Sequence, residues 1–127
     1  MRKLTAIACL STLLFASSAS AVYRMHCTGE NPNIEAIVAI DGPRVSVDVI
    51  ENGVTATPLN RPCKKISTGL LCVSVLGETR YEMYPTFVVS ELLQVAIVKH
   101  EPDVMSSYIL DNCQYVEEEE EQEEALN

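Results

Sequence analysis

The chain has 127 residues and a formal net charge of −9, from 18 acidic and 9 basic residues. This length suits a single small domain, and the acidic balance argues against nucleic-acid binding because the protein would repel phosphate at a distance. No apolar run reaches the length needed to cross a bilayer, so no membrane anchor is expected in the mature chain.

The first 21 residues have the pattern of a cleaved signal peptide. Basic residues at positions 2 and 3 precede a short apolar run over residues 4–16, and small side chains occupy positions 19–21. A signal peptidase requires this arrangement, which places cleavage between Ala21 and Val22. The sequence therefore predicts an exported protein that is periplasmic or secreted.

Alternating apolar and polar residues predict strands from the start of the mature chain. The first four are expected at residues 23–28, 34–40, 44–51 and 54–59. Asn52-Gly53 favours a type I′ turn, because both residues tolerate positive φ, and predicts a two-residue hairpin between the third and fourth strands. Pro58 and Pro62 indicate that the returning strand ends early or lies at a sheet edge.

Further strands are expected at residues 70–76, 80–84, 94–99 and 104–110. Residues 86–100 are ambiguous, because their apolar positions fit either a helix capped by Thr86 or one or two strands. Their β-branched residues favour strands, and a short helical turn around Ser90-Glu91 is left open. Residues 22–116 are thus predicted to form one all-β domain, an antiparallel sandwich or flattened barrel of about seven or eight strands.

Four cysteines remain after signal cleavage, an even number that predicts two disulfides in a small exported domain. Cys63 and Cys72 flank a stretch that can turn back near residues 67–69, so they are expected to face each other across a hairpin. Cys27 and Cys113 lie near the two ends of the domain and are expected to tie its first strand to its last. No Cys-x-x-Cys pair is present, so zinc-ribbon or thioredoxin chemistry is not expected.

Residues 117–127 hold seven of the 18 acidic residues and leave eleven acidic against seven basic residues in residues 22–116. Like charges at neighbouring positions repel one another, and the segment has little apolar surface to bury. The C-terminal segment is therefore predicted to be a disordered acidic tail.

Candidate catalytic residues are few. His26 and His100 are the two histidines available as general bases near neutral pH. His26 falls on the polar side of the first predicted strand, and His100 precedes Pro102 in a predicted turn. The sequence contains no nucleophile-elbow, metalloprotease, calcium-loop or phosphate-binding motif, so no metal, cofactor or catalytic centre is expected.

The leading hypothesis is a non-enzymatic exported domain that binds another macromolecule, and a protein is the expected partner. The basic residues Arg61, Lys64 and Lys65 form a cluster that could contact such a partner. The alternative is a small secreted hydrolase that uses His26 or His100 with a nearby carboxylate. A purely structural envelope component cannot be distinguished from the leading hypothesis by sequence.

Overall fold

A computed structural model of the chain describes residues 22–116. The predicted signal peptide, with its cleavage site at Ala21, and the acidic tail lie outside the described residues. The described residues contain strands and turns but no helix. The strands are β1 (Val22–Thr28), β2 (Ile34–Asp41), β3 (Arg44–Glu51), β4 (Val54–Thr55), β5 (Thr57–Pro58), β6 (Lys64–Ile66), β7 (Gly69–Leu76), β8 (Thr79–Val88), β9 (Glu91–His100), β10 (Met105–Leu110) and β11 (Asn112–Tyr115).

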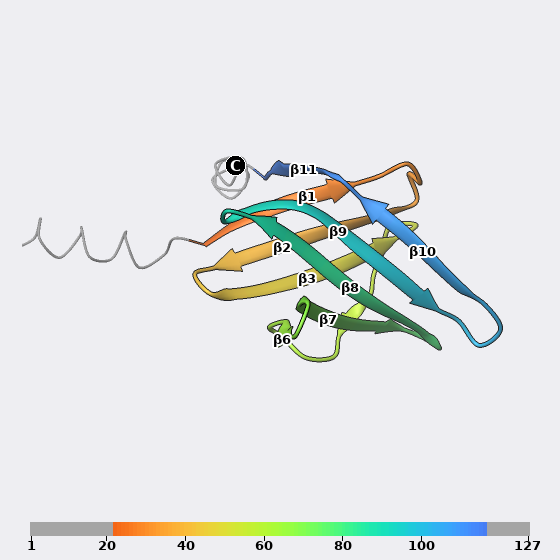
Figure 1. The fold of residues 1–127 in the computed structure, drawn as a ribbon. Helices are drawn as coiled ribbons and strands as arrows, with labels where there is room; N and C mark the ends of the chain where they lie inside the picture. The colour runs from red at the N-terminus through yellow and green to blue at the C-terminus, as the bar shows by residue number, and fades with distance from the viewer. Residues whose placement is uncertain (1–21, 117–127) are drawn as a thin grey trace, which may run out of the picture.

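These strands form two antiparallel sheets that pack face to face (Figure 1). The five-stranded sheet has the order β11-β1-β2-β3-β4, and the six-stranded sheet has the order β10-β9-β8-β7-β5 with β6 paired to β7. The all-β prediction is confirmed. The strand number exceeds the expected seven or eight because the predicted segment 54–59 is divided into β4 and β5, and because β6 and β11 are separate short strands.

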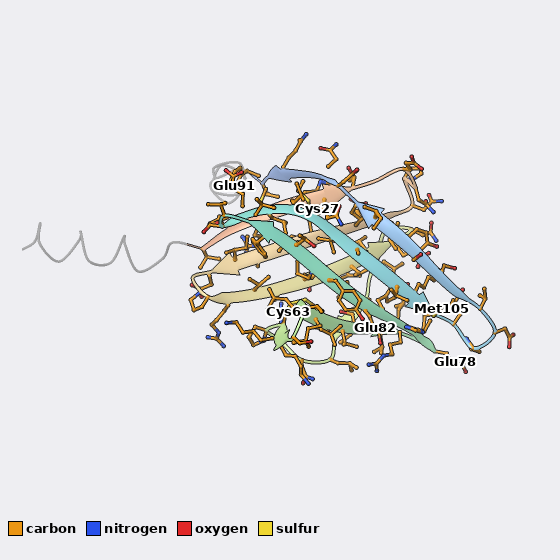
Figure 2. The ribbon with its side chains drawn as sticks, in the orientation of Figure 1. Cys27, Cys63, Glu78, Glu82, Glu91 and Met105 are labelled. Carbon is orange, nitrogen blue, oxygen red and sulfur yellow. A yellow bond between two sulfur atoms is a disulfide. The ribbon has the colours of Figure 1, made fainter. Side chains whose placement is uncertain are left out.

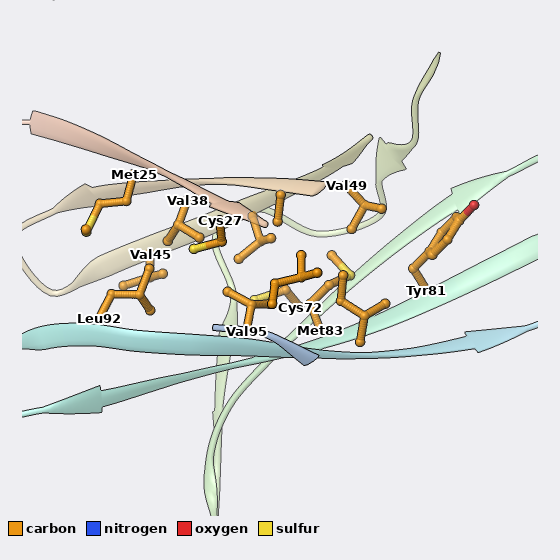
Figure 3. Close-up of a cluster of buried hydrophobic side chains, with 14 of the residues drawn as sticks. Met25, Cys27, Val38, Val45, Val49, Cys72, Tyr81, Met83, Leu92 and Val95 are labelled. Carbon is orange, nitrogen blue, oxygen red and sulfur yellow. The ribbon is translucent and has the colours of Figure 1, made fainter. Parts of the chain in front are cut away.

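The core lies between the sheets because alternate residues of each strand point inward. Ala36, Val38 and Val49 from β2 and β3 are fully buried. Val38 and Val49 face Met83 and Val95 of β8 and β9 (Figure 3). Several cysteine and valine side chains complete this cluster (Figure 3). The period-two pattern of the sequence thus corresponds to the burial pattern of the structure.

Two segments cross from one sheet to the other. At Ala56, which is buried, the chain passes from β4 to β5, and the Ala56 N–H donates to the carbonyl of Val49 at 2.8 Å. At Asp111 it passes from β10 to β11. The two sheets are therefore connected by the chain on both sides of the core (Figure 1).

Both predicted disulfides are present (Figure 2). Cys27 and Cys113 are directly paired residues of β1 and β11, so the bond joins the first strand to the last. Cys63 and Cys72 are joined across the β6–β7 hairpin. Two disulfides in a small domain indicate an oxidising compartment.

The ambiguous segment 86–100 forms the end of β8 and the whole of β9. Between them the chain turns at Val89 and Ser90, whose φ angles are 50° and 72°. Both residues are in the left-handed region that a two-residue hairpin turn requires, so the helical turn left open around Ser90-Glu91 does not form. Cross-strand pairing with β8 and β10 on its two sides decides the strand conformation of β9.

Candidate functional sites

Each histidine lies beside a carboxylate on the outer face of a sheet. His26 on β1 and Glu35 on β2 are 2.5 Å apart between Nε2 and Oε1. His100 on β9 has Nε2 3.2 Å from Glu82 Oε1 on β8, a contact without good hydrogen-bond geometry. Met25 and Cys27, the neighbours of His26 in β1, are buried in the core, and Lys99 beside His100 is directed inward to Glu51. The two rings therefore lie on the outer faces of different sheets and do not converge.

Glu82, which is labelled in Figure 2, has two further polar neighbours besides His100. Arg80 Nε lies 3.5 Å from Glu82 Oε2, and the Tyr84 hydroxyl donates to Glu82 Oε1 at 3.1 Å. Burial acts to raise the pKa of Glu82, but the contacts with His100, Tyr84 and Arg80 outweigh it and hold the pKa below its ordinary value. A carboxylate held ionised in this way is suited to pairing with cations rather than to donating a proton.

A second polar network joins the two sheets. Glu51 at the end of β3 accepts a hydrogen bond from the buried Tyr81 hydroxyl at 2.5 Å and another from Lys99 Nζ at 2.7 Å. Burial acts to raise the pKa of Glu51, but these two hydrogen bonds and the charge of Lys99 lower it overall. Burial and the hydrogen bond to Glu51 raise the pKa of Tyr81. Every polar group of this network has a partner, so the network stabilises the packing of the two sheets and offers no free group for a substrate.

The predicted basic cluster does not form one surface. Arg61 lies 3.9 Å from Asp48 on β3, between its Nη2 and the Asp48 Oδ1. Lys64 and Lys65 are successive residues of β6, and they line different hollows on the two sides of that strand. The three side chains therefore point toward three separate parts of the surface.

Within residues 22–116, no three His, Cys, Asp or Glu residues lie close enough together to hold a metal ion. The same described part of the chain has no helix of the length and apolarity that crossing a membrane requires.

The most distinctive exposed element is β10, at the edge of the six-stranded sheet (Figures 1 and 2). Its outward side chains include Met105 and Ile109, which are 66% and 51% exposed. The strand has no charged residue and no proline, the features that usually protect a sheet edge from a second chain. The other strands at the ends of the two sheets are shorter: β4 and β5 have two residues each, with Pro58 in β5, and β11 has four residues, which are also uncharged.

The main-chain groups on the free side of β10 follow from the pairing with β9. The Glu101 N–H donates to the Val104 carbonyl at 2.9 Å, so these two residues form a hydrogen-bonded pair. Along β9 and β10, hydrogen-bonded and non-hydrogen-bonded residue pairs then alternate. The main-chain groups of Met105, Ser107 and Ile109 therefore point away from β9. Gly29 agrees with this orientation and covers the Ile109 carbonyl, because a Cβ added at Gly29 would lie 2.2 Å from that oxygen. The main-chain groups that remain open along this side are therefore those of Met105 and Ser107.

Acidic residues flank the neutral centre of this edge. Glu101 and Asp103 precede β10, and Asp111 follows it. Glu30 and Asp111 also line a hollow of about 370 Å³ that runs beside Ser107 and Ile109. The β10 edge, defined here as Met105–Leu110 with this hollow, thus combines open main-chain groups at Met105 and Ser107, apolar side chains and negative charge at both ends.

No family model, curated protein or solved structure matches the chain. The sequence predicted a strand at residues 104–110 but did not identify its edge position, because strand order depends on pairing between distant segments. The lack of charged residues in this strand was the one signal available in the sequence.

Proposed function

We propose that the protein is an exported, non-enzymatic β-domain that binds another protein through the β10 edge. The observation that carries the proposal is an uncharged, six-residue edge strand whose Met105 and Ile109 side chains are more than half exposed. An extended segment of a partner can add to such an edge as a further strand, gaining main-chain hydrogen bonds and contacts for alternate side chains. The two disulfides support export, since they form and persist in oxidising compartments.

The charges around the β10 edge define the kind of segment that fits. A partner strand that is apolar in its centre and basic at its ends would contact Met105 and Ile109 with its apolar residues and Asp103 and Asp111 with its basic ends, whereas Glu101 already lies 3.8 Å from Lys99 Nζ. Complementary charge mainly raises the association rate and selects the partner, so binding should weaken as salt concentration rises.

Photocrosslinking in the native compartment tests the proposal. Benzoylphenylalanine placed at position 105 is expected to form an adduct with a second protein, and the adduct should disappear in Ile109→Lys. Val54→Lys is the matched control, because Val54 on β4 is also 51% exposed at a sheet edge. Equal loss in both variants, or an adduct only with a second copy of this chain, would overturn the proposal.

A second pair of variants isolates the main-chain contribution. Ser107→Pro removes an N–H that points to the free side of β10 and should abolish the adduct, whereas Ser107→Ala keeps that N–H and should retain it. Circular dichroism and disulfide mapping verify that each variant folds.

Intact mass of the exported protein also tests the signal-peptide prediction, with a mature chain that begins at Val22 as the expected result.

A further inference from the structure

A separate hollow of about 720 Å³ lies at the opposite end of the long strands from the β9–β10 turn. Residues from the β2–β3, β6–β7 and β8–β9 hairpins surround it, together with the start of β1. The apolar residues Ile40, Val45, Leu70 and Phe87 form much of its wall. Ile40 and Val45 belong to the hydrophobic core, and Leu70 and Phe87 pack against it, so the hollow is a continuation of the core that opens to solvent. Its size lies within the range of small-molecule sites.

Lys65 supplies the single charged side chain among the residues that line this hollow. Among the described residues, no acidic group pairs with its ammonium group. Lys64, the preceding residue of β6, lines a different hollow with Leu59 and Leu71. An unpaired cation beside an apolar wall is complementary to an apolar molecule that carries a negative charge at one end.

Charged residues outside the wall of the hollow do not cancel the attraction of Lys65 for an anion. Asp41 and Arg44 flank the β2–β3 turn and together line the adjoining hollow on the Arg61 side, so they oppose each other in sign. Glu91 lines another small hollow beyond Ser90. Lys65 is therefore the cation placed to contact an anion inside the large hollow.

The β8–β9 turn beside this hollow is built from unfavourable residues. Val89 is β-branched, has a φ of 50° and is 90% exposed, so it contributes little to the core. The β3–β4 turn at the other end of the molecule uses Asn52-Gly53 for the same backbone conformation. This strained, exposed turn adjoins the open apolar hollow through Ser90. Backbone strain of this kind is typical of binding sites, whereas a turn that only stabilised the fold would use residues that favour positive φ.

We infer that this hollow binds a small anionic amphiphile, such as a medium-chain carboxylate. The carboxylate would pair with the Lys65 ammonium group, and the alkyl chain would cover the wall formed by Ile40, Leu70 and Phe87. This site is distinct from the β10 edge, and its occupancy does not depend on a protein partner.

Isothermal titration calorimetry with the mature chain tests the inference. Dodecanoate, below its micellar concentration, should bind with one molecule per chain, and Lys65→Gln should weaken the affinity about tenfold, as expected for loss of one charge-assisted contact. Lys64→Gln is the matched control and should bind as the wild type does, because its side chain lies outside the hollow. Amide chemical shifts should change at residues around Leu70 and Phe87.

Dodecyltrimethylammonium separates specific binding from simple partitioning of an apolar chain. It should bind at least tenfold more weakly than dodecanoate, because it places a positive charge near Lys65. Equal affinity for the two amphiphiles, equal weakening by Lys65→Gln and Lys64→Gln, or no dodecanoate binding to the wild type would each overturn the inference. None of these measurements involves the β10 edge, so failure here leaves the proposed function to its own crosslinking test.

Discussion

Replacing Tyr81 with phenylalanine tests the network that joins the two sheets. The Tyr81 side chain is buried, with 1% exposure, and its hydroxyl is one of two donors to the Glu51 carboxylate. Tyr81→Phe keeps the ring but leaves Glu51 with Lys99 as its remaining hydrogen-bond donor. A hydrogen bond to a charged group contributes about 1.5–3 kcal/mol, so we expect the free energy of unfolding to fall by about 2 kcal/mol.

The assay is guanidinium unfolding with both disulfides intact, followed by circular dichroism. Tyr84→Phe is the control, because the Tyr84 hydroxyl donates to Glu82 on the outer face of the sheet, where the contact is more hydrated. That variant should lose about 0.5 kcal/mol or less. If Glu51→Gln is combined with Tyr81→Phe, the losses should be less than additive, because both variants disrupt the same hydrogen bond.

Two results would refute this account of the network. One is a Tyr81→Phe variant that unfolds at the wild-type guanidinium concentration with an unchanged slope. The other is full additivity of the Tyr81 and Glu51 substitutions, since residues in direct contact should be coupled.

Three further predictions follow from buried groups and from the strained turn. Because the pKa of Glu51 is lowered in the folded protein, its stabilising contribution is present above its ordinary value of 4.5 and is lost as pH falls through the folded-state pKa. Because the pKa of Tyr81 is raised, its contribution is complete below the ordinary value of 10.0 and declines as pH rises beyond it. Unfolding curves across pH should therefore show a plateau with losses on both sides, and a flat response would contradict the assignment. Val89→Asn combined with Ser90→Gly should raise the free energy of unfolding by about 1 kcal/mol or more, because both new residues tolerate positive φ. Thermal or guanidinium unfolding measures this gain. A loss of stability would show that Val89 packs favourably. Ser74 is fully buried, and its Oγ has no hydrogen-bond partner in the described residues. Ser74→Ala should therefore leave the free energy of unfolding unchanged or raise it by up to about 1 kcal/mol. A clear destabilisation would show that the hydroxyl has a hydrogen-bond partner.

Much of the local structure was predictable because it depends on short-range patterns. Alternating residues such as Ala36, Val38 and Ile40 bury one face of a strand wherever that strand lies in a sheet. The Asn52-Gly53 turn was equally readable, because positive φ is a property of those residues. The β8–β9 turn was not, because Val89 and Ser90 adopt the same conformation against their own preference, under the constraint of the paired strands on either side.

The candidate sites depend on which distant segments become neighbours. Lys64 and Lys65 form one cluster in the sequence, yet strand alternation directs them into different hollows, and Arg61 lies near Asp48 instead. The contact of Glu51 with Lys99 joins residues 48 positions apart, which no local pattern reports.

The sequence by itself determined the all-β class, the main strand positions and the two disulfides, because alternation and cysteine spacing act through local geometry. Only the tertiary structure decided that β10 is an exposed edge strand of the six-stranded sheet, and that three hairpins surround an open apolar hollow beside Lys65. The physical reason is that edge position and concavity arise from the order in which strands pair, which is fixed by the packing of the two sheets as a whole.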